Sequence, residues 1–375
     1  MAVRRLDVLP ELLTTRIFMR RWIGSSVSGE KVSYSKVNDT SKREDFIVKL
    51  KRTLLIVTIL ALVVGSLAVG TGAAPKSKKS YTFVFVPKLV HPWYQDVIDG
   101  MNQAVKEFAE RGIKINTIWN APSQADVAMH TQKIEASIAK RPDGIAVSSL
   151  DPTANTPVLK EAIRRGIPTI CFDNDAEQSG RAAFVGHPKN EPDGRDMADA
   201  LAEAIGYEGE VAVLIGSLGS LQHGQRVAGF KERIAEKYPK IKIVADLVDN
   251  DDLEKAIRLS TDALKAHPNL KGFYGANASA PVGAAKAVEA AGKAGKVFVV
   301  GQDDLPDMVR YMRKGIVYAM DVQRPYDMGY WSVYYLYALN NGLTIPELHE
   351  TGSYVIKKKD LKQYPKYNGD AYQVK

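Results

Sequence analysis

The chain has 375 residues, of which 45% are hydrophobic and 25% charged, a composition typical of folded proteins with material for two domains. Its net charge of +8 is concentrated near the start, because residues 1–74 hold 12 Lys and Arg against 6 Asp and Glu. The remainder is nearly neutral, which argues against a basic surface that follows a nucleic-acid backbone, and we expect no nucleic acid among the partners.

The N-terminal segment contains a pattern typical of export signals. Lys49–Arg52 is basic, Leu54–Val69 is apolar, and Gly70–Ala74 contains small residues. This order predicts a secretory signal peptide over residues 49–74, with cleavage after Ala73. An uncleaved membrane anchor is the alternative, although the apolar run is short for a spanning helix, which needs about 20 residues. The segment has no cysteine, so a lipid anchor is not expected.

Residues 1–48 precede this signal and show neither sustained periodicity nor an obvious core. We interpret them as an N-terminal extension that is disordered. Alternatively, translation begins near Val48 and the upstream stretch is not part of the protein. Peptides from residues 1–42 in the intact expressed protein would exclude that second interpretation.

From Tyr81 onward, short β-rich runs alternate with amphipathic segments of helical length. The first group of expected strands covers residues 81–86, 114–119, 145–148 and 167–172. The helices expected between them cover residues 93–111, 125–139 and 157–165. This alternation predicts right-handed β-α-β crossovers and a parallel sheet.

The same pattern then restarts. The second group of expected strands covers residues 182–185, 210–215, 241–247, 270–274, 297–300 and 316–322. The accompanying helices are expected at 195–205, 222–237, 253–266, 282–291, 305–314 and 326–340. Ten strands are more than one compact sheet usually needs, so we predict two similar doubly wound α/β lobes with a ligand cleft between them.

Two loops that contain proline are the expected hinges between these lobes. They lie near Gly186–Pro188 and Gln323–Pro325. The first lobe then comprises residues 75–185 plus 324–345. The second lobe comprises residues 186–323 plus 346–375.

Four of the expected strands end on a polar side chain that can bind a hydroxyl group. These side chains are Asp173, Asn277, Asp303 and Gln323. In an open parallel sheet the ligand lies just beyond the carboxyl ends of the strands, so we expect the four to converge on one small, hydroxyl-rich molecule. Asn174 is a further candidate because an amide both donates and accepts hydrogen bonds, although Asp173 and Asn174 could instead form a local turn.

Aromatic and basic side chains complete the expected site. Trp93 and Tyr94 follow the first strand, where an aromatic face can cover the C–H face of a sugar; alternatively, both rings cap the core. Arg226 lies early in the helix expected at 222–237, and its planar guanidinium can bridge two hydroxyls, although a lone helical arginine is usually solvated. Asp303 also has an alternative, since it or Asp304 could cap the helix that follows.

The sequence contains no pattern that indicates catalysis, a metal or a cofactor, and we expect none of the three. The six histidines lack metal-ligand spacing, and Gly216–Ser220 lacks the dinucleotide and P-loop patterns. A glycosidase pair of carboxylates is the alternative that the sequence does not test. The one cysteine, Cys171, lies in an apolar strand and is expected to pack as a small hydrophobic residue.

Several motifs, in this order, resemble the exported sugar-binding proteins of ABC importers, of the ribose-binding type, within the type I periplasmic binding proteins. The resemblance covers about residues 80–345. The motifs are Pro87–Tyr94, Cys171–Asn174, Gln225–Phe230, Tyr274–Asn277, Val300–Asp303 and Ala319–Gln323. The R-x-x-G-F pattern of the third motif strengthens Arg226 as a ligand contact, and the last motif is similar to the segment that supplies a ligand glutamine, here Gln323.

Departures from the ribose-binding pattern concern the substrate. His91, a candidate ligand contact, stands where ribose binders have Asn, and Asn174 stands where they have Arg. The segment Pro87–Val90 is also similar to the opening of binders for a furanosyl quorum-sensing signal, in which the lysine contacts the ligand, so Lys88 is a candidate as well. Arg226 fits the sugar group better, and we favour a sugar or polyol.

The resemblance implies a protein outside the cytoplasmic membrane, in the periplasm, that delivers its ligand to an ABC transporter permease. It implies that the lobes close around the sugar, with His91 and Asp173 on one lobe and Arg226 on the other. A monomer is expected. The alternatives are a binder of the furanosyl signal and a sugar sensor that acts on a chemoreceptor or kinase.

Overall fold

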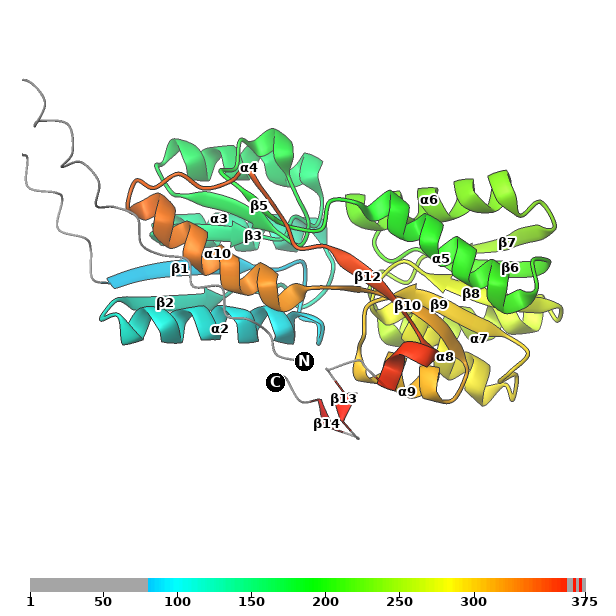
Figure 1. The fold of residues 1–375 in the computed structure, drawn as a ribbon. Helices are drawn as coiled ribbons and strands as arrows, with labels where there is room; N and C mark the ends of the chain where they lie inside the picture. The colour runs from blue at the N-terminus through cyan, green and yellow to red at the C-terminus, as the bar shows by residue number, and fades with distance from the viewer. Residues whose placement is uncertain (1–79, 363–366, 369–370, 373–375) are drawn as a thin grey trace, which may run out of the picture. The chain divides into compact units, whose positions relative to one another are not determined.

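The computed structural model describes residues 80–362, 367–368 and 371–372. The expected N-terminal extension and signal peptide lie outside these residues. Within the described part, two α/β lobes are each built on a six-stranded sheet (Figure 1). The predicted fold class is therefore confirmed. A separate two-stranded sheet pairs β13 (Tyr367–Asn368) with β14 (Ala371–Tyr372).

The first lobe has an all-parallel sheet with two helices on each face. Its strands, in spatial order, are β11 (Leu348–Glu350), β5 (Phe184–Gly186), β4 (Thr169–Phe172), β3 (Gly144–Val147), β1 (Ser80–Val86) and β2 (Lys114–Trp119). Its helices are α2 (Tyr94–Glu110), α3 (Val127–Ala139), α4 (Pro152–Arg164) and α10 (Pro325–Asn340). Because side chains alternate along a strand, Phe83 packs toward α2 and α10, whereas Val84 packs toward α3 and α4.

The second lobe repeats this plan. Its strands, in spatial order, are β12 (Ser353–Lys357), β10 (Val317–Gln323), β9 (Phe298–Gln302), β8 (Leu270–Gly275), β6 (Gly209–Leu214) and β7 (Ile241–Leu247). Its helices are α5 (Asn190–Ile205), α6 (Leu221–Lys237), α7 (Leu253–Ala266), α8 (Ser279–Ala290) and α9 (Pro306–Arg313). α5 and α6 cover one face, and α7, α8 and α9 the other. Only the edge strand β12 is antiparallel to its neighbour.

Glycines allow the closest helix pairs to touch. A Cβ atom at Gly194 of α5 would overlap the carbonyl oxygen of Arg226 on α6, and Gly229 of α6 is equally close to the α5 backbone. Gly100 and Gly329 have the same role between α2 and α10. Both lobes therefore pack one helix pair backbone to backbone, and in the second lobe this contact lies at a predicted ligand residue.

Three connections between the lobes are present among the described residues. The third joins β11 to β12 through Thr351 and Gly352. Because β11 pairs in parallel with β5, residues 348–350 belong to the first lobe, whereas the sequence placed this crossing after residue 345. A three-residue strand is too short to show a periodic pattern, which explains the error.

α4 and α5 each begin five residues earlier than the sequence predicted. α4 begins at Pro152 instead of Pro157, because the Asp151 side chain accepts a hydrogen bond from the Ala154 N–H and caps the first turn. α5 begins at Asn190 instead of Arg195. The early start of α5 places Asn190 in the lining of a pocket next to the lobe connections.

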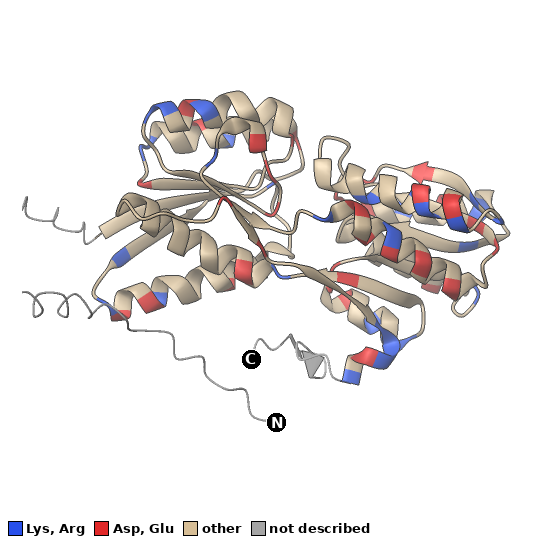
Figure 2. Ribbon diagram, turned by 45° about the horizontal axis from the view of Figure 1, so that its top comes forward, with Lys and Arg blue, Asp and Glu red and all other residues tan. Residues whose placement is uncertain are grey.

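Charged residues of both signs are interspersed over the two lobes (Figure 2). This distribution agrees with the nearly neutral charge that remains once residues 1–74 are set aside. Helices of both lobes carry basic and acidic side chains together, and ion pairs such as Arg233 with Asp199 join them on the second lobe.

Candidate functional site

Nine of the ten predicted site residues line one cavity between the lobes, which we call the interlobe cavity. They are Lys88, His91, Trp93, Tyr94, Asp173, Arg226, Asn277, Asp303 and Gln323. Gln222, His223 and Asp251 also line it. The cavity is small, about 30 Å³, because side chains of the two lobes form hydrogen bonds to one another across it. A ligand would replace these bonds.

Both aspartates at the strand ends adopt a left-handed backbone conformation. Asp173 has a φ of 59° and Asp303 a φ of 68°. Such angles are uncommon outside glycine, and Asp is among the few residues that tolerate them. The strands β4 and β9 thus end in sharp turns that leave a buried carboxylate at the cavity.

The Asp173 carboxylate is held by three groups of the first lobe. Its Oδ2 accepts hydrogen bonds from the hydroxyls of Tyr94, at 2.8 Å, and Ser148, at 2.6 Å. The Lys88 ammonium lies 3.7 Å from the same oxygen. Burial, together with the Asp173 charge, raises the pKa of Tyr94 well above its ordinary value, so this hydroxyl remains a donor. The carboxylate is therefore fixed in place as a hydrogen-bond acceptor.

The Asp303 carboxylate joins the two lobes. Its Oδ1 accepts hydrogen bonds from the indole Nε1 of Trp93, at 2.8 Å, and from the Gln323 amide, at 3.1 Å. Burial raises the pKa of Asp303 to about 6. The alternative role as a helix cap is wrong for Asp303, because α9 begins after Leu305, which makes no side-chain capping bond.

His91 also reaches across the cleft. Its Nδ1 accepts a hydrogen bond from the Trp93 backbone N–H, at 3.1 Å, so the neutral ring carries its proton on Nε2. Nε2 lies 2.8 Å from the Ser279 hydroxyl of the second lobe and donates to it. Burial lowers the pKa of His91, which favours this neutral form.

Asn277 is oriented by two aspartates and by the start of α8. Its amide nitrogen donates to Asp249, at 3.0 Å, and to Asp251, at 2.6 Å, while its oxygen accepts from the Ala280 N–H. Burial and the neighbouring Asp251 charge raise the pKa of Asp249 to about 7. Asp251 lines the cavity with a buried Oδ2 that has no hydrogen-bond partner among the described residues.

Arg226 is buried with unused donors. Its Nη1 donates to the Ala276 carbonyl at 3.4 Å, and its Nε lies 3.8 Å from Asp193 Oδ2. Within the described part of the chain, Nε and Nη2 have no hydrogen-bond partner. Buried donors of this kind are costly unless they are paired, and hydroxyl oxygens of a ligand would pair them.

Asn174 lies apart from the other nine residues. It faces an adjoining pocket, where its amide donates to the Gln222 side chain at 3.2 Å and accepts from the Ser220 hydroxyl at 3.3 Å. The sequence predicted Asn174 as a contact in the same cleft as Asp173. The structure places it at the border between the two spaces.

Three polar cavity residues were missed from the sequence, namely Gln222, His223 and Asp251. Gln222 and His223 lie one helical turn before Arg226, so the spacing of α6 could have identified them. Asp251 follows the end of β7, and the strand-end rule that identified Asp173 applies to it equally.

The described part of the chain contains neither a metal-binding cluster nor a membrane-spanning helix. Among these residues, no group of three or more His, Cys, Asp and Glu side chains is placed to hold a metal ion. Helices long and apolar enough to cross a bilayer are likewise absent from this part. Cys171 is fully buried, as predicted, and burial raises the pKa of its thiol.

Comparison with known proteins places these observations in a family. Residues 82–344 match the periplasmic binding protein domain. The D-allose-binding periplasmic protein of Escherichia coli is 30% identical over 253 residues, which cover 66% of this chain and 80% of that protein. The D-ribose/D-allose-binding protein of Pseudomonas aeruginosa is 28% identical over 275 residues, covering 72% of this chain and 84% of that protein.

Solved structures agree with this match. An ABC transporter solute-binding protein from Burkholderia graminis, in complex with D-arabinose, has a TM-score of 0.71 and 32% identity, covering 77% of this chain and 99% of that one. A periplasmic solute-binding protein from Actinobacillus succinogenes with bound D-allose has a TM-score of 0.68 and 31% identity, covering 76% and 100%. The fold, the cleft and the extent of the sequence match lead to one conclusion: this chain belongs to the periplasmic binding protein family.

Proposed function

We propose that this protein captures a monosaccharide or polyol in the interlobe cavity and delivers it to the permease of an ABC importer. The observation that carries the proposal is the convergence of hydrogen-bonding groups from both lobes on one buried space. Carboxylates at Asp173 and Asp303 accept hydrogen bonds, and Arg226 donates them. A sugar hydroxyl does both, so it matches this mixture.

The aromatic residues support a sugar more than another polar ligand. Trp93 and Tyr94 stand edge to face, with ring centroids 5.1 Å apart, and both line the cavity. An apolar surface beside fixed polar groups suits a pyranose or furanose ring, which has C–H faces and a hydroxyl rim. The relatives named above bind D-allose, D-ribose or D-arabinose, which favours a sugar over the furanosyl signal.

Ligand binding would be coupled to closure of the lobes. A ligand shifts such an equilibrium only through contacts that it makes in one state and not in the other. A sugar bound to Asp173 of the first lobe gains contacts with Arg226 and Asp303 of the second only when the lobes meet. The closed form would then be the one that the permease recognises, and the protein would act as a monomer.

A thermal-shift screen tests the binding function. Residues 75–375 are purified and mixed with pentoses, hexoses, deoxysugars and polyols, and the best ligand is titrated by calorimetry. We expect one or a few sugars to raise the melting temperature and to bind with 1:1 stoichiometry. A chain that is folded but unaffected by every sugar and polyol would refute the proposal.

We further propose that the protein works outside the cytoplasmic membrane after cleavage of the signal segment behind Ala73. The family is named for periplasmic proteins, which supports this location. Intact-mass analysis of the protein from the periplasmic fraction should find a chain that begins at Ala74. A chain that retains residues 49–74 in the membrane fraction would instead indicate an anchor.

A further inference from the structure

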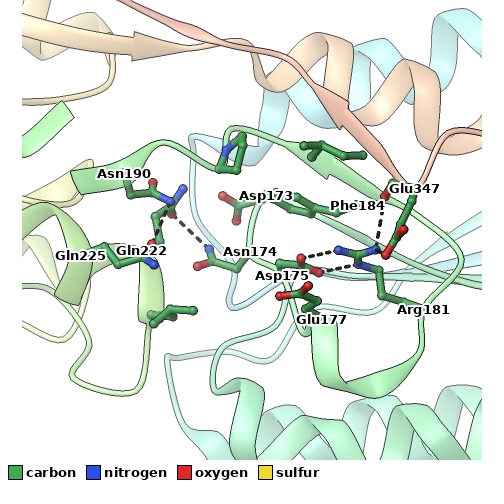
Figure 3. Close-up of a pocket in the computed structure, with 13 residues that line it drawn as sticks. Asp173, Asn174, Asp175, Glu177, Arg181, Phe184, Asn190, Gln222, Gln225 and Glu347 are labelled. Atoms are coloured by element: carbon green, nitrogen blue, oxygen red, sulfur yellow. Dashed lines mark hydrogen bonds and ion pairs between the residues drawn. The ribbon is translucent and has the colours of Figure 1, made fainter. Parts of the chain in front are cut away.

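A second pocket, here called the side pocket, adjoins the interlobe cavity (Figure 3). Its volume is about 350 Å³. Asp173 and Gln222 line both spaces, so the two are neighbours that share a wall. The interlobe cavity is the proposed sugar site, whereas the side pocket has no role in that proposal.

The wall between the two spaces is a weak one. Asp173 forms a fixed part of it, and the other part includes the hydrogen bond of 3.2 Å from the Asn174 amide of the first lobe to the Gln222 amide of the second. Gln222 in turn donates to Gln323 in the interlobe cavity, also at 3.2 Å. A neutral hydrogen bond contributes little net stability, so a ligand that offers both amides hydroxyl partners can replace it.

The side pocket contains an unused hydrogen-bond acceptor. Asn190 is 7% exposed, and its Oδ1 is buried without a hydrogen-bond partner among the described residues. Its amide nitrogen donates to Gln225 Oε1 at 3.3 Å, which fixes the orientation of the side chain. Buried acceptors are almost always paired in folded proteins. This oxygen is closed off from the side pocket, so a ligand hydroxyl would supply the missing donor through a shift of the Asn190 side chain.

The buried charges of the side pocket are paired, and its two other carboxylates are exposed to solvent at the rim, so the buried wall suits an uncharged ligand. Arg181 binds both oxygens of Asp175, at 2.7 and 2.6 Å, and Lys88 lies beside Asp173. Glu177 and Glu347 are exposed at the rim. The remaining wall is apolar and consists of Phe184, Pro188, Leu221 and Leu348.

We propose that the side pocket is a second sugar subsite, and that the preferred ligand is a disaccharide or other glycoside. One ring would occupy the interlobe cavity, and the second would pass between Asn174 and Gln222 into the side pocket. Its hydroxyls would bind the amides of Asn190 and Gln225, and its C–H face would lie on Leu221. This inference rests on the proposed sugar-binding function and specifies its substrate class.

Calorimetry on the purified chain of residues 75–375 tests the inference. The ligands are the best-binding monosaccharide, its methyl and phenyl glycosides, and disaccharides that carry it at either end. We expect at least one disaccharide or phenyl glycoside to bind tenfold or more tightly than the monosaccharide. Leu221→Trp, which fills the side pocket, should remove that advantage and change the monosaccharide dissociation constant less than twofold.

Leu218→Trp is the matched control, because Leu218 is 74% exposed and lines neither space. It should leave both affinities unchanged. If the monosaccharide binds and every larger ligand binds more weakly, the second subsite is refuted while the proposed function stands. If the larger ligands keep their advantage in Leu221→Trp, the subsite is also refuted. If no sugar of either size binds, both proposals fail.

Discussion

The indole Nε1 of Trp93 donates a 2.8 Å hydrogen bond to Oδ1 of Asp303, and this bond crosses from one lobe to the other. Trp93 precedes α2 of the first lobe, and Asp303 follows β9 of the second. The bond can exist only while the lobes are in contact. It therefore links the ligand site to closure through two residues that both line the cavity.

Trp93→Phe should weaken sugar binding by roughly tenfold, because it keeps an aromatic face but removes the donor to a buried carboxylate. The measurement is the dissociation constant by calorimetry, with the thermal unfolding midpoint as a check on folding. Trp331→Phe, on the exposed side of α10, is the matched control and should bind normally. Equal affinity in the wild type and Trp93→Phe would mean that the indole bond does not contribute to the bound state.

Asp303→Ala should reduce sugar affinity by at least tenfold in a protein that still folds. A buried hydrogen bond that involves a charged group contributes about 1.5–3 kcal/mol, and a sugar hydroxyl would lose this acceptor. Asp307→Ala, on the half-exposed first turn of α9, is the control. Unchanged affinity in Asp303→Ala would remove this residue from the site.

Sugar affinity should rise with pH between about 5 and 7. Burial raises the pKa of Asp303 to about 6, with Asp304 adding to the increase and Arg226 opposing it. Only the ionised carboxylate accepts hydrogen bonds at both oxygens. At pH 5 about one protein molecule in ten has an ionised Asp303, so sugar affinity should fall up to tenfold. Asp303→Asn should flatten the profile. If Asp249→Asn flattens it instead, Asp249, whose pKa is about 7, is the titrating group.

The contribution of Asp303 to the free energy of unfolding should show the opposite dependence on pH. Because the folded-state pKa of Asp303 lies above its unfolded value of 3.8, the folded protein binds more protons between about pH 4 and 6. The contribution of Asp303 to the free energy of unfolding therefore falls as pH rises through that window. Urea unfolding gives the free energy of unfolding of Asp303→Asn minus that of the wild type. This difference should be more favourable to the variant at pH 7 than at pH 4. A difference that is independent of pH would contradict the raised pKa.

The convergence of the site could be predicted because parallel strands bring their carboxyl ends to one edge of a sheet. That rule placed Asp173, Asn277 and Asp303 together from positions that span 130 residues of the chain, from 173 to 303. The partner of each side chain could not be predicted, since it depends on how the lobes meet. Asn174 illustrates this: its position beside Asp173 indicated the cavity, but its amide bonds to Gln222 at the border with the side pocket.

The lobe connections show a second limit. The two hinges that contain proline could be predicted from the sequence. The β11–β12 connection contains no proline and consists of Thr351 and Gly352, with Gly352 at a φ of 77°, between two short strands. Strands of this length have no periodic signal, and their pairing with β5 and β10 is decided by tertiary contacts. The sequence therefore predicted the sheets better than the position of the third crossing between the lobes.

Asp193 should affect sugar binding from outside the cavity. Its Oδ2 lies 3.8 Å from Arg226 Nε, while its Oδ1 contacts His187 at 3.0 Å and Ser353 at 3.1 Å, both next to lobe connections. Asp193→Asn removes the charge that positions Arg226 and should weaken sugar affinity about fivefold or more. Arg226→Lys combined with Asp193→Asn should lose less than the sum of the single effects. Additive losses would mean that Asp193 acts independently of Arg226.

Gly194→Ala should lower both stability and sugar affinity, because the added methyl group would overlap the Arg226 carbonyl oxygen and push α6 away from α5. Overpacking of this kind costs about 1–3 kcal/mol in the free energy of unfolding. Gly224→Ala is the matched control on α6, since a Cβ there meets nothing within 4 Å and should be neutral or stabilising by up to about 1 kcal/mol. Urea unfolding and calorimetry measure the two effects separately. Loss of stability without loss of affinity in Gly194→Ala would show that the ligand site tolerates a shift of α6, which would weaken the case for Arg226 as a fixed donor.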